Sequence, residues 1–208
     1  MADPDEYRIA DVEALRAVVG ELKPGSELKL LDALDEYAVD FIARSPFLIL
    51  STSDPEGHQD ASPKGDGPGF VLVEDEHTLV IPDRLGNRLI MGHLNLLANP
   101  QVGLLFLIPG TNETLRVNGR AALTRDPALL ERLAARGRPA VLAIRVRVEE
   151  VFFHCAKAFL RSELWQPESW PERKKISFGK MFAKKLSADD AVAQQIDSAI
   201  EENYRTEL

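Results

Sequence analysis

Short apolar runs joined by tight turns are the feature that most constrains the fold of this chain. Phe47–Thr52 is a continuous apolar run of strand length, and the turn-forming residues Asp54–Gly57 follow it. His58–Lys64 then returns as a polar stretch, so the three segments have the signature of a β-hairpin. Strands joined by so short a turn run antiparallel, because parallel neighbours need a long crossover connection.

Further strands of the same kind are expected along the chain. The full set is Phe47–Thr52, His58–Lys64, Phe70–Val73, Thr78–Ile81, Gln101–Ile108, Glu113–Leu123 and Ala140–Phe153. In the last of these, Ile144, Val146 and Val148 alternate with charged residues, which is the pattern of a half-buried strand. Turns rather than helices connect most of the strands. This order predicts an antiparallel barrel, mainly β with peripheral helices, rather than a doubly wound α/β sheet.

Helices are predicted at both ends of the chain and between some strands. They cover Asp11–Val19, Ser26 to about Ala43, the segment after the turn Asp83–Asn87, Ala128–Ala135, a short stretch after His154, and Ala188–Tyr204. Ser26 is the expected N-cap of the second helix, and Ser187 with Asp190 has the spacing of a capping box for the last. In the segment after Asn87, apolar residues recur at helical spacing.

The composition is that of one globular domain with a full core, at 208 residues and 45% hydrophobic content. We expect N-terminal helices over 1–43, the barrel core over 44–154 and a helical segment over 155–208.

A net charge of -8 argues against nucleic-acid binding, which needs a basic surface. The single cysteine, Cys155, allows no intrachain disulfide. The acidic N-terminus and the lack of a membrane-length apolar run predict a cytoplasmic protein without a membrane partner.

Basic residues gather where the Thr78–Ile81 strand gives way to the next helix. Arg84 and Arg88 lie beside the expected helix start, whose backbone N–H groups lack intrahelical partners and carry the positive end of the dipole. Lys64 adds a third cation if strand pairing brings it alongside; the alternative is a solvated lysine on an edge strand. The pattern predicts an anion site, which suits a phosphate and needs no metal.

Side-chain chemistry of the usual catalytic kinds is not expected. The four histidines fall in no metal-binding spacing, Cys155 has no second thiol, and we expect no metal site. His93 is interpreted as a packed helix residue. There is also no G-x-S-x-G elbow for acyl transfer, so we assign no catalytic side chain. If the chain is an enzyme, a cofactor carries the reaction.

Four stretches taken in order make the chain recognisable. They are FLILSTSDPEGHQDASPKGDGPGFVLV, TLVIPDRLGNRLIMGHLNLLANPQVGLLFLIPG, ETLRVNGRA and FFHCAKAFLRSELW. From about Phe41 to Trp165 the chain resembles the pyridoxamine 5'-phosphate oxidase-like flavoproteins, in the branch described as FMN-dependent enzymes. The resemblance implies a split β-barrel, a homodimer, and FMN bound in a cleft at the dimer interface.

The resemblance also implies which residues bind FMN. They are Asp60, Ser62, Lys64, Ile81, Pro82, Arg84, Asn87, Arg88, Arg116, Arg161 and Trp165. In the family, the strand matching Asp60–Lys64 touches the phosphate and ring, and the strand end matching Ile81-Pro82 lies against the isoalloxazine. The pair matching Asn87-Arg88 holds the phosphate. Arg116 and the stretch Lys157–Trp165 come from the partner subunit.

Three functions are consistent with this resemblance. The first is an FMN-dependent oxidoreductase acting on an unknown small molecule. The second is a non-catalytic flavin- or haem-binding module, with His93 or His154 as a haem ligand, and the third is a reductase that uses a deazaflavin. The Arg-x-His stretch with which the true oxidases bind pyridoxamine phosphate is not found between Trp165 and Leu208. The resemblance therefore implies FMN binding without that specific oxidase activity.

Overall fold

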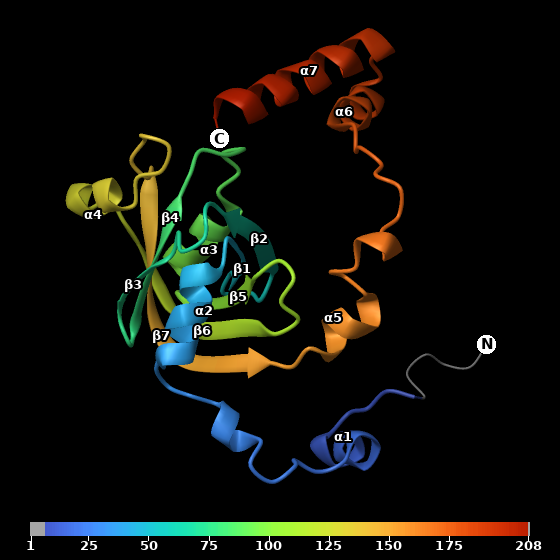
Figure 1. Ribbon diagram of the computed structural model, residues 1–208. Coiled ribbons are helices and arrows are strands. Elements are labelled where there is room, and N and C mark those ends of the chain that lie inside the picture. The colour runs from blue at the N-terminus through green and yellow to red at the C-terminus, as the bar shows by residue number, and fades with distance from the viewer. Residues whose placement is uncertain (1–6, 208) are drawn as a thin grey trace.

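The computed structural model describes residues 7–207, which build one antiparallel sheet with helices around it (Figure 1). The strands are β1 (Phe47–Ser53), β2 (Gln59–Gly65), β3 (Leu72–Asp75), β4 (Thr78–Asp83), β5 (Gln101–Leu107), β6 (Thr114–Thr124) and β7 (Leu142–His154). They form a seven-stranded sheet in the order β2-β1-β5-β6-β7-β4-β3. Every pairing is antiparallel, so the predicted mainly β fold is confirmed.

The sheet curls until its two ends meet, but it does not close through backbone hydrogen bonds. β2 is one edge of the sheet and pairs only with β1, whereas β4 lies next to the opposite edge. Even so, Lys64 Nζ of β2 lies 2.5 Å from Asp83 Oδ1 at the end of β4. Side chains bridge the opening, and the architecture is therefore the split barrel that we expected.

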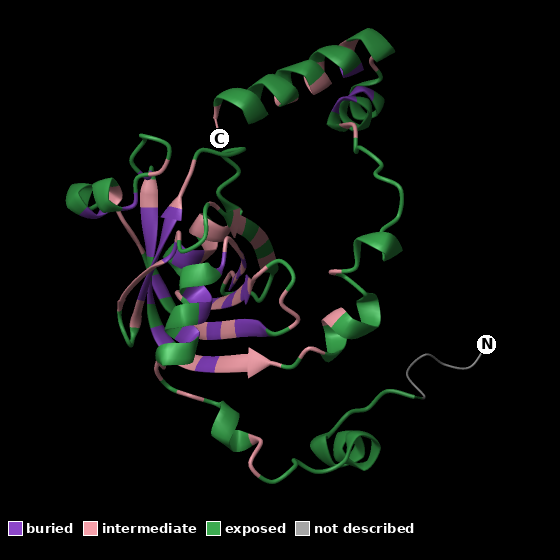
Figure 2. Cartoon of the chain, viewed as in Figure 1, coloured by how far each residue is buried: buried purple, intermediate pink, exposed green. Residues whose placement is uncertain are grey.

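A single apolar cluster fills the inside of this curled sheet. Its buried residues include Leu50 from β1, Ile81 from β4, Phe106 from β5, Val117 from β6 and Ile144 from β7. Along β1, β5, β6 and β7, buried residues alternate with half-buried or exposed ones over most of the length (Figure 2), as the pleat of a strand requires. The centre of β4 is buried on both faces, because Val80 belongs to a second apolar cluster with Leu129 and Leu133. The convergence of five strands on one cluster fixes the register that positions the ends of β2 and β4.

Helices flank the barrel and extend from both of its ends. They are α1 (Val12–Val19), the 3-10 turn η1 (Glu27–Lys29), α2 (Glu36–Arg44), α3 (Met91–Ala98), α4 (Pro127–Arg132), α5 (Lys157–Ser162), the 3-10 turn η2 (Pro167–Ser169), α6 (Phe178–Leu186) and α7 (Asp190–Thr206). None of the helices in the described range 7–207 is long and apolar enough to cross a membrane.

The continuous helix predicted from Ser26 to Ala43 is wrong. Ser26 precedes only the short turn η1 and makes no side-chain capping bond. Leu31 then forms an isolated β-bridge with Val151 of β7, and the backbone bonds in that bridge compete with helix formation. α2 starts later, where the Asp35 carboxylate accepts a hydrogen bond from the Ala38 N–H.

The C-terminal segment forms an arm that leaves the barrel after β7 and arches beside it (Figure 1). α6 and α7 pack closely, because a Cβ on Gly179 would lie 1.9 Å from the Ala193 carbonyl oxygen. The Asp197 carboxylate accepts hydrogen bonds from the Ser177 hydroxyl and the Gly179 N–H, and these bonds lower the pKa of Asp197. The helical hairpin thus has its own internal contacts.

The predicted capping box at the last helix is also wrong. Ser187 ends α6 in the left-handed conformation, at φ 53°, and Asp189 instead caps α7 by accepting from the Val192 N–H. The far end of α7 returns to the barrel, where Arg138 Nη1 donates to the Thr206 carbonyl.

Gly119→Ala tests the close approach of β6 and β7, and we expect it to lower the free energy of unfolding by about 3 kcal/mol. A Cβ there would lie 2.0 Å from the Arg147 carbonyl oxygen, which the sheet cannot move freely. Gly103→Ala on the neighbouring strand is the matched control, because its Cβ would meet the Asn118 side chain at 3.3 Å. Its cost should stay near about 1 kcal/mol. Urea unfolding measures both, and equal losses would contradict the register of the sheet.

Candidate functional site

A pocket of about 300 Å³ lies at the opening of the barrel, between β2, the end of β4 and the start of α3. Its lining includes Asp60, Ser62 and Lys64 from β2, Asp83 and Arg84 from the end of β4, Asn87, Arg88 and Met91 from the following segment, and His93 from α3. Leu50 contributes an apolar surface from the barrel interior. Several site residues that we predicted from two separate stretches of sequence therefore share one cavity.

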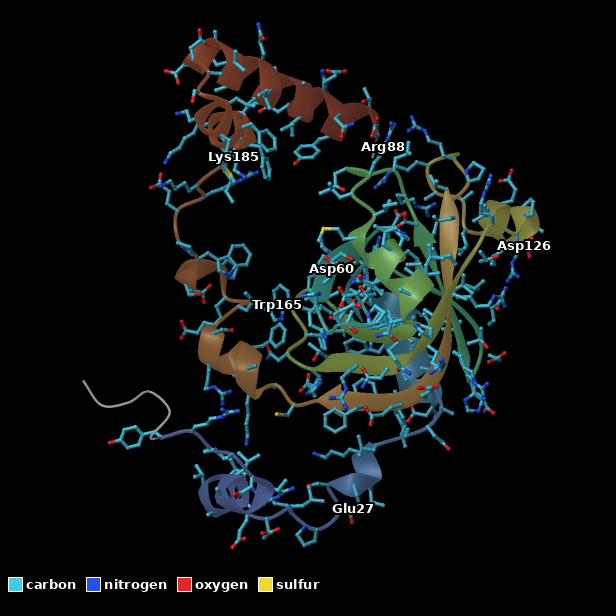
Figure 3. All side chains as sticks on the ribbon, turned by 180° about the vertical axis from the view of Figure 1, so that it is seen from behind. Glu27, Asp60, Arg88, Asp126, Trp165 and Lys185 are labelled. Carbon is cyan, nitrogen blue, oxygen red and sulfur yellow. The ribbon has the colours of Figure 1, made fainter. Side chains whose placement is uncertain are left out.

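β2 supplies one wall because its side chains alternate across the strand. Asp60, Ser62 and Lys64 are half-buried and face the pocket, whereas the intervening residues are exposed. α3 packs closely against this wall: a Cβ on Gly92 would lie 3.2 Å from the Asp60 carboxylate. Figure 3 shows Asp60 on this side of the barrel, facing the α3 region.

An ion pair joins the two walls at the opening. Lys64 Nζ contacts Asp83 Oδ1 at 2.5 Å, and the two side chains are only 18% and 14% exposed. The other carboxylate oxygen, Asp83 Oδ2, lies 3.3 Å from His93 Nε2. That contact lacks hydrogen-bond geometry, and Nε2 is buried without a hydrogen-bond partner. Asp83 therefore lies between two nitrogen bases from different elements.

Arg84 is engaged in structural contacts next to the pocket. Its Nε donates to Asp66 Oδ2 at 3.0 Å, and its Nη2 donates to the Leu133 carbonyl at 2.8 Å. Its Nη1 is buried without a partner. Arg84 thereby ties the loop after β2 to the loop after α4, although it also lines the pocket.

Arg88 is the exposed cation of the pocket, and within residues 7–207 it makes no ion pair at the 4.0 Å criterion used for the others. Its backbone is left-handed at φ 60°, as is that of Ile90 at φ 49°. Such conformations are costly for residues with a side chain and cluster at binding sites. The Asn87 side chain stabilises this turn by accepting from the Leu89 N–H at 3.0 Å.

The helix after this turn begins later than we predicted. α3 starts at Met91, with Ile90 as an N-cap that makes no side-chain hydrogen bond, so its first N–H groups have no capping side chain. The predicted apolar stripe is wrong as a buried face: Leu89, Ile90, Leu94 and Leu97 are exposed and Leu96 is buried. Polar anchors fix the helix instead, since Asn95 Nδ2 donates to the hydroxyl of buried Thr52.

Lys64 does not reach its position by strand pairing, because β2 does not pair with β4, the strand that precedes Arg84. β2 bonds only to β1, and Lys64 meets the end of β4 across the barrel opening. Ile81 and Pro82, at the end of β4, are buried and do not line the pocket. They form the strand end from which Asp83 and Arg84 project.

Three predicted residues lie away from the pocket within the same chain. Arg116 Nη2 donates to Glu150 at 2.7 Å on the outer face of the sheet, and its guanidinium lies 5.1 Å from the Phe152 ring centroid. Trp165 donates to the Thr111 carbonyl at 2.8 Å and stacks on Phe159, and it lies in the arm between α5 and η2 (Figure 3). Arg161 is exposed on α5.

His154 lies beside Arg116 on this outer face. Partial burial lowers the pKa of His154, and the positive charge of Arg116 lowers it further. The outer face therefore favours the neutral form of this histidine. Its ring packs edge-on against Phe152, with centroids 4.8 Å apart.

Potential metal ligands meet on the exposed turn between β1 and β2. One ligand atom from each of Asp54, Glu56 and His58 lies within 4.8 Å of the others. His58 Nδ1 already contacts Asp54 Oδ2 at 2.7 Å, and this hydrogen bond is the main reason that the pKa of Asp54 is lowered. The contact within the turn accounts for the grouping.

Sequence reasoning missed Asp66, Asp83 and the position of His93. Asp83 follows directly after a buried strand and precedes Arg84 and Arg88, which we selected for their charge. Its position at a strand end was the signal that could have identified it as a site residue. His93 was expected as a packed helix residue; its side chain is only 14% exposed, but it lies beside a carboxylate in the pocket.

Comparisons with known proteins match the barrel portion of the chain. The family model described as Pyridoxamine 5'-phosphate oxidase matches residues 34–155, more than half of the chain. A search of curated proteins found no match.

Solved structures with a similar barrel are distant in sequence. HupZ of Group A Streptococcus is 17% identical, with a TM-score of 0.47, and the match covers 58% of this chain and 93% of that one. A Clostridium acetobutylicum protein related to general stress protein 26 is 16% identical over 58% of this chain and 90% of that one, with a TM-score of 0.44. An FMN-binding protein from Syntrophomonas wolfei is 11% identical over 55% and 81%, with a TM-score of 0.45.

Arg84→Gln should lower the free energy of unfolding by about 2 kcal/mol, because it leaves the Asp66 carboxylate without its closest cation. Asp66 is only 9% exposed, so water replaces that contact poorly. Arg136→Gln is the matched control: its guanidinium lies 4.0 Å from the same carboxylate and is 61% exposed. That change should stay within about 0.5 kcal/mol. Chemical denaturation compares the two, and a larger loss for Arg136→Gln would contradict this assignment.

Proposed function

The chain belongs to the pyridoxamine 5'-phosphate oxidase family, a flavin-binding family, and from that premise we propose that the pocket at the barrel opening binds FMN for an FMN-dependent oxidation or reduction of a small molecule. The observation that carries the proposal is the convergence of Lys64, Asn87 and Arg88 on one pocket. These side chains come from separate stretches of the chain. Their chemistry suits a phosphate, which prefers cations and N–H donors.

The pocket fits an anionic group by its charges and its unused donors. Three cations line it, Lys64, Arg84 and Arg88, against the two carboxylates Asp60 and Asp83. Two of these cations contact carboxylates, which leaves Arg88 as the most accessible binding charge. The uncapped start of α3 adds backbone N–H groups near Arg88.

In this proposal, Arg88, Asn87 and the start of α3 hold the phosphate, while Lys64 supports the same negative charge from the opposite wall. Ile81 and Pro82, buried at the end of β4, would hold in place the strand end from which Asp83 and Arg84 project into the pocket. Bound FMN supplies two-electron transfer at its N5. The side chains bind and orient it, and Leu50 with the apolar wall limits access of water.

A second copy of the chain completes the site in the same proposal. The pocket, at about 300 Å³, is at the lower end of the range of about 300–1,000 Å³ typical of small-molecule sites. Next to it, Met91 and Leu94 of α3 are exposed. An apolar partner surface at this position covers them and encloses the flavin ring.

The outer face of the sheet is the surface through which the copies pair. Ile49, Leu105, Arg116 and Phe152 lie side by side there on β1, β5, β6 and β7, and all four are half-buried. In this arrangement the partner's copies of Arg116, Arg161 and Trp165 approach the flavin, which accounts for their distance from the pocket of their own chain.

FMN titration is the direct test of the function. The purified protein should be yellow or should quench FMN fluorescence at micromolar concentration, and Arg88→Gln should weaken the binding of FMN at least about tenfold, because a charge-assisted phosphate contact is lost. Arg44→Gln, an exposed arginine paired with Asp40, is the control and should bind as the wild type does. Mass spectrometry of the released ligand separates FMN from a deazaflavin. A colourless protein that takes up neither flavin would exclude the proposal.

Leu105→Glu tests the pairing surface. A carboxylate in the middle of the outer face opposes burial, so the variant should be monomeric in sedimentation velocity while the wild type sediments as a dimer. Arg125→Glu, a charge reversal at an exposed residue after β6, is the control and should leave the wild-type mass unchanged. A wild-type monomer, or a dimer that survives Leu105→Glu, would contradict this surface.

A further inference from the structure

We infer that His93 is a positioning residue that controls, through its protonation, how strongly Lys64 attracts the phosphate of the bound flavin. The inference rests on the proposed function and concerns the same pocket. It starts from Asp83, whose two carboxylate oxygens face different bases: Oδ1 is 2.5 Å from Lys64 Nζ, and Oδ2 is 3.3 Å from His93 Nε2.

The buried nitrogen of His93 lacks a partner, and this is the second observation. Buried polar atoms are nearly always hydrogen-bonded, so an orphaned nitrogen beside a carboxylate needs an explanation. A neutral ring with its lone pair toward Asp83 gains nothing from that carboxylate. A ring that carries a hydrogen on Nε2 donates it to Asp83 after a small rotation, and a doubly protonated ring adds a positive charge to the same contact. His93 thus has a second state for which its surroundings are already arranged.

Protonation of His93 changes what Lys64 can do. With neutral His93, the Lys64–Asp83 pair has no net charge, and Lys64 is held at the carboxylate. With protonated His93, Asp83 is shared between two cations and the cluster has a net charge of plus one. Lys64 can then direct its positive charge to an anion in the pocket, because Asp83 keeps His93 as its partner.

The other charged side chains around Lys64, Asp83 and His93 do not reverse the effect of His93 protonation on Lys64. Asp60 faces the pocket from β2, and Arg84 and Arg88 face it from the segment after β4. Arg84 is paired with Asp66, so its charge is already compensated. Asp60 and Arg88, the two charged residues of the lining that make no ion pair within residues 7–207, have opposite charges that offset each other.

The sign of the pH effect follows from these states. Histidine side chains gain a proton as the pH falls through the range of about 8 to 5. Protonation of His93 favours the anion, and by linkage a bound anion favours protonation of His93. The contribution of His93 to FMN affinity should therefore grow as the pH is lowered, and proton uptake at His93 should accompany binding of the phosphate.

The experiment measures FMN affinity from pH 8 to pH 6 in the wild type, in His93→Gln and in the control His77→Gln, which changes a half-exposed histidine in the turn between β3 and β4. The wild type and His77→Gln should gain about tenfold in affinity relative to His93→Gln between these pH values. Riboflavin, which lacks the phosphate, should bind with no such difference. The FMN phosphate titrates equally in all three proteins, so the ratio isolates His93.

A wild-type measurement guards against a variant that does not fold. Calorimetry of FMN binding at pH 8, where the phosphate, with a second pKa of about 6, is almost fully ionised, gives the number of protons exchanged when two buffers of different ionisation enthalpy are compared. We expect net uptake for FMN and none for riboflavin. Proton release with FMN, or the same affinity ratio at every pH in the wild type and His93→Gln, would overturn the inference. Absence of FMN binding at every pH would instead overturn the proposed function.

Discussion

The contact between Lys64 and Asp83 is the interaction on which the site depends. It joins an edge strand to the end of β4 where no backbone hydrogen bonds are made. A mostly buried ion pair adds little net stability, because removing two charges from water costs about as much as their attraction returns. Loss of one partner is nevertheless expensive, since it leaves a charge without compensation. The pair therefore specifies how the barrel opening is arranged more than it stabilises the fold.

The position of the pocket follows from the way the sheet ends. In a closed barrel, the inward face of every strand contributes to an apolar core. Here β2 is an edge strand, and its inward residues Asp60, Ser62 and Lys64 meet the end of β4 and the start of α3 instead of apolar side chains. Polar groups are tolerated at this place because water and ligands can reach it. The opening is thus both the weak seam of the barrel and the place where a charged ligand can bind.

The sequence predicts those parts of the fold that depend on local patterns. Hairpin turns, period-two alternation and the strand Ala140–Phe153 gave the antiparallel sheet, because each signal lies within a few residues of the element it predicts. The single helix from Ser26 failed because Leu31 bonds to Val151, far along the chain. A capping preference of about 1 kcal/mol cannot outweigh such a distant contact.

In the candidate site, too, some residues could be predicted from the sequence and others could not. Lys64 and Arg88 were found from their charge, and the resemblance to a family added Asn87 and gave the roles of all three. The roles of Asp83 and His93 could not be predicted, since a carboxylate after a strand and a histidine on a helix gain meaning only when the segment between β4 and α3 folds and brings the two side chains within 3.3 Å. Exposed apolar residues at helical spacing, such as Leu94 and Leu97, misled for the complementary reason: the spacing shows that a face exists but not what covers it.

A protein with a net charge of -8 can still attract a phosphate, and the arrangement of charges explains how. At physiological ionic strength the Debye length is about 8 Å, so the acidic surface beyond the pocket is largely screened from a ligand inside it. The charges that line the pocket then decide whether a phosphate is attracted. Three of them are cations, and two of these cations contact carboxylates. Because few of these charges lack a partner, one added proton changes the net charge of the pocket by a large fraction. The proton-linked binding that we propose would follow from this sharing of cations between carboxylates and the ligand.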